Sequence, residues 1–95
     1  MIYVCHPYGG KPRNKNNVEK IILNLSTTST ATFVSPIHVF GFMYNLVSYD
    51  TGMLYCLELL EKCDSAIFCP GWEKSMGCRQ EMEWCKTYGK PYVIL

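Results

Sequence analysis

The sequence predicts an α/β protein in which a parallel sheet of about four strands forms the middle of three layers, with helices flanking it on both sides. Short apolar runs alternate along the chain with longer segments whose apolar residues recur at helical spacing. The apolar runs lack polar alternation, which is typical of strands buried on both faces of a parallel sheet. With 95 residues, 48% of them hydrophobic and 18% charged, residues 1–95 suit a single domain with one core.

The first quarter of the chain predicts a strand, a turn and a helix. Residues 2–5 are β-branched or aromatic apart from one cysteine and predict a buried strand, and a turn follows at Gly9 and Gly10. From Asn16 to about Ser26, apolar residues recur at helical spacing with polar residues between them, which predicts an amphipathic helix.

The middle of the chain predicts a second strand and a second helix. Residues 31–35 are β-prone and stop at Pro36, which cannot continue a central strand. The aromatic-rich residues 37–49 fit neither period, and we expect a functional loop or an irregular helix there. Asp50 is expected to cap a helix that ends near Cys63.

The last third predicts a strand over residues 66–69, a helix from Ser75 to about Gly89, and a final strand over residues 92–95. Right-handed crossovers between parallel strands place the helices on both faces of the sheet.

Ligands bind beyond the carboxyl ends of the strands in such sheets. The site is therefore expected in three loops, over residues 6–13, 36–49 and 70–77. Asp64 precedes the third predicted strand, so it is expected at the opposite edge, away from the chemistry.

The carboxylate of Glu81 is the best candidate for a reactive group. At about 100° per residue, Glu81 lies about 60° from Cys78 on the buried side of its helix, whereas Glu83 lies about 140° away and is expected in solvent. A carboxylate on an apolar face usually has a partner or a function. The alternative is that Glu81 forms a salt bridge with Lys74 or Arg79 at the margin of that face.

Other residues of the edge loops are candidates for ligand binding. His6 follows a strand end, Gly9 and Gly10 can bring backbone amides close to an anion, and Ser75 with Gly77 begins a helix whose dipole favours phosphate. Each feature has an ordinary interpretation as well: a packed histidine, a turn and a helix cap.

Aromatic side chains gather in the same loops, where a flat base can stack on them, although any one of them can instead belong to the core. These residues are Tyr8, Phe40, Phe42, Tyr44 and Trp72.

Charge and cysteine spacing argue against several classes of protein. The formal net charge of +1 provides no broad positive field, so we expect no nucleic-acid partner. The six cysteines form no Cys-x-x-Cys pair, so we expect neither a metal nor another cofactor. The first apolar run is far shorter than a secretory signal, which predicts reduced thiols in a cytoplasmic protein, and no segment reaches the ~20 apolar residues of a membrane span. The low charged content predicts a homo-oligomer, because a second subunit would cover apolar surface.

Four motifs in order carry a family resemblance over most of the chain. They are residues 2–5 with Gly9 and Gly10, residues 63–66, residues 72–81 and residues 89–93. In this arrangement the chain resembles the nucleoside 2-deoxyribosyltransferase-like superfamily, which includes small nucleoside 5'-monophosphate N-glycosidases and short uncharacterised bacterial and phage proteins. The resemblance implies a flavodoxin-like or Rossmann-like fold.

The spacing of Ser75, Gly77 and Glu81 is similar to the catalytic segment of that superfamily. The resemblance implies that Glu81 attacks the anomeric carbon of the sugar, that Tyr3 orients the Glu81 carboxylate, and that Ser75 holds a 5'-phosphate. The implied reaction is cleavage of an N-glycosidic bond in a nucleoside or nucleotide through a glycosyl-enzyme ester, which water or a second base then resolves.

Two departures from the superfamily pattern bear on this expectation. Cys56 stands where the deoxyribosyltransferases carry an aspartate, and Asp50 is a substitute for that acid only if its loop folds inward. Enzymes of the superfamily continue beyond the fourth strand with a segment that reaches a neighbouring subunit's site, so the pocket is expected to be incomplete here.

Three functions remain open from the sequence. The favoured one is an N-glycosidase or deoxyribosyltransferase that uses Glu81. The second is a non-catalytic nucleotide-binding module of the same fold, which would release no free base. The third is a structural subunit, which predicts that Glu81 is exposed.

Overall fold

The central sheet has four parallel strands in the order β2-β1-β3-β4, which confirms the predicted fold class. The computed structural model describes all of residues 1–95. Tyr3 of the inner strand β1 pairs with Val34 of β2 on one side and with Ala66 of β3 on the other. The strands are β1 (Ile2–Cys5), β2 (Phe33–Val34), β3 (Ser65–Phe68) and β4 (Tyr92–Ile94).

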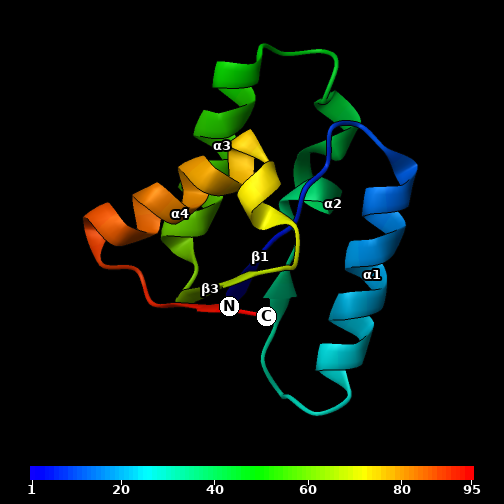
Figure 1. Ribbon diagram of the computed structural model, residues 1–95, viewed down its shortest axis with the longest axis vertical. Coiled ribbons are helices and arrows are strands. Elements are labelled where there is room, and N and C mark those ends of the chain that lie inside the picture. Colours follow the sequence, from blue (N-terminus) through cyan, green and yellow to red (C-terminus); the bar gives the residue numbers. More distant parts are fainter.

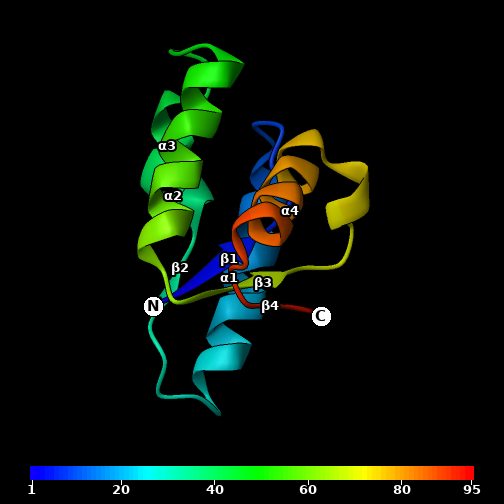
Figure 2. The same ribbon diagram turned by 90° about the vertical axis from the view of Figure 1, so that its left-hand side faces the viewer.

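Helices flank the sheet on both sides (Figure 1 and Figure 2). In Figure 1, α1 lies to one side of the strands, and α3 and α4 lie to the other. None of the helices is both long enough and apolar enough to cross a membrane. The helices are α1 (Pro12–Ser26), α2 (Pro36–Phe40), α3 (Tyr49–Lys62) and α4 (Met76–Tyr88), with short 3-10 helices η1 (Gly41–Met43) and η2 (Trp72–Lys74).

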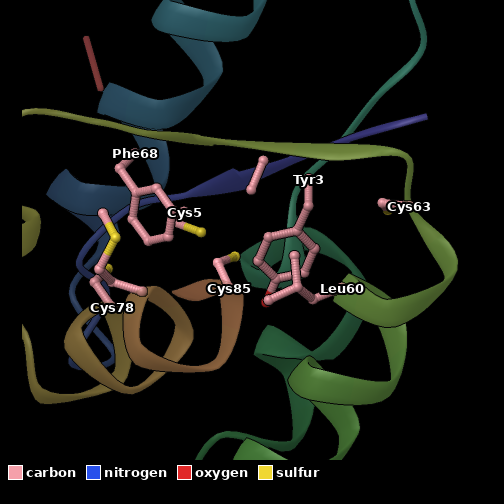
Figure 3. Close-up of a cluster of buried hydrophobic side chains, with 9 residues drawn as sticks. Tyr3, Cys5, Leu60, Cys63, Phe68, Cys78 and Cys85 are labelled. Atoms are coloured by element: carbon pink, nitrogen blue, oxygen red, sulfur yellow. The ribbon is translucent and has the colours of Figure 1, made fainter. Parts of the chain in front are cut away.

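Alternation along β1 separates the two apolar clusters that hold the layers together. Tyr3 and Cys5 belong to the cluster formed with α3 and α4, whereas Val4 belongs to the cluster formed with α1 and α2. Figure 3 shows the ring of Tyr3 between the strands and the helices, close to Leu60 of α3 and Cys85 of α4. Because side chains alternate along the strand, the Tyr3 side chain points towards the face of the sheet that α4 covers.

Two helix starts differ from the sequence prediction. Helix α1 begins at Pro12, four positions before the predicted start, because proline is well suited to the first turn of a helix. The prediction that Asp50 caps α3 is wrong: the Ser48 hydroxyl accepts a hydrogen bond from the Thr51 amide at 3.2 Å. Asp50 lies in the first turn, where its charge complements the helix dipole. The expected irregular helix after Pro36 is confirmed as α2 followed by η1.

Strand β4 departs from the expectation that the strands are buried on both faces. It pairs only with β3, and Val93 and Ile94 are 56% and 55% exposed. An edge strand has a neighbour on one side alone, so fewer elements cover it.

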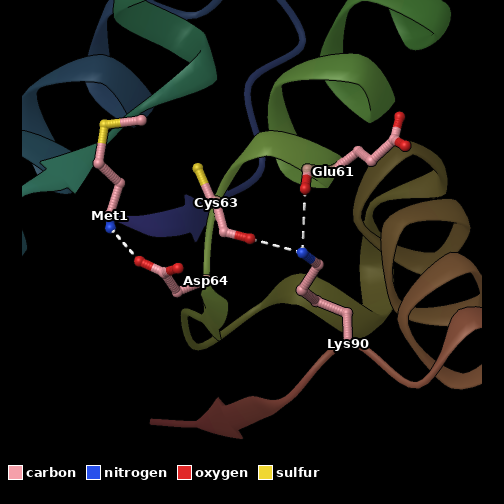
Figure 4. A network of polar contacts seen from close by, with 5 residues as sticks. All are labelled: Met1, Glu61, Cys63, Asp64 and Lys90. Carbon is pink, nitrogen blue, oxygen red and sulfur yellow. Dashed lines mark hydrogen bonds and ion pairs between the residues drawn. The ribbon is translucent and has the colours of Figure 1, made fainter.

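The amino edge of the sheet is held by a polar network (Figure 4). The terminal amine of Met1 forms an ion pair with Asp64 at 2.5 Å. The Lys90 ammonium donates hydrogen bonds to the carbonyls of Glu61 and Cys63, at 3.1 and 2.5 Å, at the end of α3. Asp64 therefore lies at the edge opposite the strands' carboxyl ends, as predicted.

Candidate functional site

The site lies where the chain reverses its direction across the sheet. The β1-to-β2 connection runs to one side and the β3-to-β4 connection to the other, so a crevice opens at the carboxyl ends of β1 and β3. A pocket of about 620 Å³ occupies this position, within the usual size range of small-molecule sites. Segments that follow β1 and β2 line it, together with the first turns of α3 and α4.

Glu81 projects from α4 into this region and is only 5% exposed. The Tyr3 hydroxyl, itself fully buried, donates a hydrogen bond to Glu81 Oε2. The predicted inward orientation of Glu81 is therefore confirmed, and the exposure of Glu81 that a structural subunit would require is contradicted. The alternative salt bridge is also absent, because Arg79 instead donates to the carbonyl of Glu73 at 2.8 Å.

Burial controls the ionisation of the Glu81 carboxyl. Removal from water raises the pKa of Glu81 to about 7, and hydrogen bonds from Tyr3 and Cys5 offset only part of that rise. Burial, followed by the charge of Glu81, raises the pKa of Tyr3 well above its ordinary value. Tyr3 is therefore a hydrogen-bond donor to the carboxylate at any physiological pH.

Cys56 and Tyr49 extend the site onto α3. Tyr49 is the last residue of the predicted loop 36–49, and Cys56 stands at the position that the resemblance gives to an aspartate. Cys56 lines the pocket, and burial followed by the charge of Glu81 raises the pKa of its thiol to about 11. The Tyr49 hydroxyl donates to Gln80 Oε1 at 2.9 Å and ties α3 to α4. Apart from that correspondence, Cys56 has only the apolar pattern of α3, which it shares with ordinary core residues.

His6 lines the pocket, but both of its ring nitrogens are occupied. Nδ1 lies 2.7 Å from the Pro7 carbonyl, and Nε2 lies 2.8 Å from the side-chain amide nitrogen of Asn17. The carbonyl only accepts and the amide nitrogen only donates, so both contacts suit a neutral imidazole with its proton on Nδ1. His6 therefore shapes the wall without offering a free base.

The glycine turn after β1 builds the mouth of the pocket. Gly10 has a φ of 71° and leaves room for the ring of Tyr44, since a Cβ there would lie 3.0 Å from that ring. The Tyr8 and Tyr44 rings meet edge to face with centroids 5.1 Å apart. Tyr8, Gly9 and Tyr44 line the pocket. Gly10 does not line it, but it makes room for the ring of Tyr44.

The first turn of α4 presents donors and open space to the pocket. Ser75 Oγ caps the helix by accepting from the Cys78 amide at 3.2 Å, which leaves its own proton free to donate. A side chain on Gly77 would enter the space beside Met53 Sδ, at 3.4 Å, and Tyr49 Oη, at 3.6 Å. Ser75 and Gly77 both line the pocket.

Three of the predicted ligand-binding residues, Gly10, Asp50 and Trp72, are not among those that line the pocket, and neither is the aromatic candidate Phe42. Trp72 packs edge to face against Phe68, with centroids 5.6 Å apart, so its indole joins the core on the α4 side of the sheet. Asp50 is exposed at the start of α3. It therefore supplies no second acid to the pocket.

Together, the fold and the pocket define an α/β protein with a single buried carboxylate at the carboxyl edge of a parallel sheet. Residues 1–95 match the model of the DUF7768 family, described as a domain of unknown function, and the chain belongs to this family. Neither the search of curated proteins nor the search of solved structures found a match.

Proposed function

We propose that this protein cleaves the N-glycosidic bond of a nucleoside or nucleoside 5'-monophosphate, with Glu81 as the nucleophile. The observation that carries the proposal is a buried carboxylate that borders a pocket of about 620 Å³ and accepts a hydrogen bond from Tyr3. A carboxylate nucleophile needs this combination of partial desolvation and fixed orientation. The resemblance to the deoxyribosyltransferase-like superfamily supports the same assignment.

The remaining pocket residues have roles that follow from their contacts. Tyr3 positions the carboxylate, and the phosphate of a nucleotide would sit at the first turn of α4, where the Ser75 hydroxyl and the free backbone amides point. Tyr8 and Tyr44 offer aromatic surface to the base at the pocket mouth.

The reaction has two covalent steps. An oxygen of ionised Glu81 forms an ester bond with C1' as the C1'–N bond breaks, and the base leaves with the electron pair of that bond. Water, or a second base in a transferase, then attacks C1' and returns Glu81 to its carboxylate form. The raised pKa of about 7 means that Glu81 is ionised in about half of the free protein at neutral pH.

Release of free base is the decisive assay. The protein is incubated with a panel of nucleosides and 5'-monophosphates, and the products are separated by chromatography. We expect release by the wild-type protein and none by Glu81→Ala, with circular dichroism confirming that the variant folds. Release that survives in Glu81→Ala, or its absence across the whole panel, contradicts the proposed activity.

A non-catalytic nucleotide-binding module is the second candidate, and one observation favours it. Glu81 is the only carboxylate among the residues that line the pocket, whereas most glycosidases use two. Ligand binding by calorimetry without base release would select this candidate. Homo-oligomerisation stays a prediction, and the exposed apolar side chains of β4 are consistent with it.

A further inference from the structure

The buried carboxylate of Glu81 has no cationic partner within the protein. The two ion pairs of the structure join Met1 to Asp64 and His38 to Glu19. Lys11 and Lys74 line the pocket, but neither pairs with Glu81. An ionised carboxylate in a desolvated position is stabilised by an opposite charge nearby. The space beside Glu81, although not the pocket as a whole, is therefore complementary to a positive charge on a ligand.

The pocket also lacks a second carboxyl group that could protonate a departing base. His6 has both nitrogens engaged by Pro7 and Asn17. The thiol of Cys56, with a pKa of about 11, is a far weaker acid than a carboxyl group. A positioned general acid typically contributes about 10²- to 10⁴-fold to such a step, and a neutral purine or pyrimidine would have to leave without it.

Four aromatic residues line the same pocket as Glu81. Tyr8, Phe40, Tyr44 and Tyr49 all line the pocket, and three of them belong to the segments after β1 and β2. The faces of such rings attract cations, most strongly where water is excluded. A flat, positively charged ring would contact aromatic surface while its positive charge faces the carboxylate.

From this geometry we infer that the substrates are N-glycosides whose heterocycle already carries a positive charge, such as pyridinium ribosides or N7-alkylated purine ribosides. The inference rests on the proposed function and narrows its substrate class. A quaternised ring needs no protonation to leave, which suits a pocket whose only carboxyl group is the nucleophile.

The step balances without any further reactant. Glu81 Oε bonds to C1', the C1'–N bond breaks, and its electron pair neutralises the positive ring, so the base departs uncharged. Water then attacks C1', the ester bond breaks, and one proton passes to solvent. One proton is therefore released for each cationic substrate hydrolysed, and none is released for a neutral nucleoside.

Matched substrate pairs test the inference. N7-methylguanosine is compared with guanosine, and oxidised nicotinamide mononucleotide with its reduced form, which is neutral in the ring. We expect kcat/KM for the cationic member to exceed that of the neutral member by about 100-fold or more, since that is the least a missing general acid typically costs. Reactions without protein and with Glu81→Gln correct for spontaneous loss of the labile cationic bases. Comparison of the two pairs also shows whether the preferred heterocycle is a purine or a pyridinium ring.

A gain of function at Cys56 provides an independent test. Cys56→Asp places a second carboxyl group in the pocket near Glu81, and like charges raise the pKa of one member of such a pair. We expect this variant to release base from guanosine faster than the wild-type protein does, whereas Cys56→Asn, of similar size but without an acid, should not. In Cys56→Asp, the ratio of kcat/KM for the cationic substrate to kcat/KM for the neutral one should fall by about tenfold or more.

Binding measurements make the outcome independent of turnover and of the folding of the Cys56 variants. At pH 8 we expect oxidised nicotinamide mononucleotide, whose pyridinium charge does not titrate, to bind the wild-type protein about tenfold more tightly than its reduced form, and this ratio should fall towards one in Glu81→Gln. Neutral nucleosides that are cleaved as well as the cationic ones overturn the inference and leave the proposed function standing. Charge-selective binding without base release supports the inference on recognition and overturns the proposed function. Equal binding of the cationic and the neutral ligand, with no base released from either, overturns both the inference and the proposed function.

Discussion

The hydroxyl of Tyr3, in the first strand, donates a hydrogen bond to the carboxylate of Glu81, which lies 78 residues further along the chain in the last helix. Both side chains are buried, and the carboxyl group borders the pocket at the carboxyl edge of the sheet. The pair links the inner strand of the sheet to the helix that carries the proposed nucleophile. Removal of this hydrogen bond should therefore change both the ionisation of Glu81 and the proposed activity.

Tyr3→Phe should raise the pKa of Glu81 further and slow base release by about 10- to 100-fold, because a hydrogen bond to a charged group is worth about 1.5–3 kcal/mol. The rate against pH, followed by chromatography of the free base, measures both effects. Tyr88→Phe, which alters a tyrosine of α4 that is 70% exposed, is the matched control and should change neither quantity. If the Tyr3→Phe protein keeps the wild-type rate and pH dependence, Tyr3 has no part in the proposed reaction.

The raised pKa of Glu81 predicts a specific dependence of stability on pH. The folded pKa of about 7 exceeds the ordinary value of 4.5, so the folded state favours the protonated form. The free energy of unfolding is highest, as far as this group is concerned, below about pH 4.5. It falls as the pH rises towards 7 and no longer changes above that value.

Glu81→Gln should remove this dependence while keeping an oxygen acceptor for Tyr3. Above pH 7 we expect the variant to be more stable than wild type by up to about 3 kcal/mol, with little difference at pH 4. Urea unfolding at several pH values measures the difference. Glu83→Gln, at an exposed position two residues away, should follow the wild-type curve. Parallel curves for wild type and Glu81→Gln would show that burial does not perturb this carboxyl group.

The dependence of kcat/KM on pH should show one ascending limb. In the proposed reaction the ionised form of Glu81 attacks, so the rate should rise with a midpoint near 7 and then level off. No descending limb is expected up to about pH 9, because the thiol of Cys56 has a pKa of about 11 and no second carboxyl group lines the pocket. A bell-shaped profile in this range would reveal a general acid that the pocket geometry does not contain.

Ser75 offers a way to separate phosphate binding from helix capping. Ser75→Ala should raise KM for 5'-monophosphates by about tenfold, corresponding to the loss of one charge-assisted hydrogen bond, and leave nucleosides unaffected. The lost cap should also cost about 1 kcal/mol of stability. Ser75→Asp keeps a cap but repels phosphate, so it should restore the stability and not the KM. Equal KM changes for nucleosides and nucleotides would argue against a phosphate site here.

Lys90 should matter for stability alone. Its ammonium holds two carbonyls at the end of α3, at the edge of the sheet opposite the pocket. Lys90→Met should lower the free energy of unfolding by about 1–2 kcal/mol, with kcat and KM unchanged. Lys86→Met, at an exposed position of α4, serves as the control in thermal unfolding. A change in activity for Lys90→Met would mean that the two edges are coupled.

The sequence predicted the layers and the inward turn of Glu81 because both depend on periodicity. The apolar run of β1 and the helical spacing around Cys78 and Met82 leave little freedom in which faces are buried. The start of α3 was less determined, since Ser48 and Asp50 are both favourable caps only two positions apart.

Pocket membership was harder to predict, because it depends on how elements meet in space. Cys56 has the same local pattern as a core cysteine, and only the packing of α3 against α4 places it beside Glu81. Trp72 is in an edge loop, as predicted, but its ring turns back onto Phe68. No local signal in the sequence specifies the direction of such a ring.

The wide separation of Tyr3 and Glu81 in the chain has a consequence for biosynthesis. A ribosome must complete almost the entire domain before the last helix can dock onto the first strand, so a nascent chain holds no assembled reactive pair. The proposed nucleophile therefore gains its hydrogen-bond partner only after α4 has been synthesised.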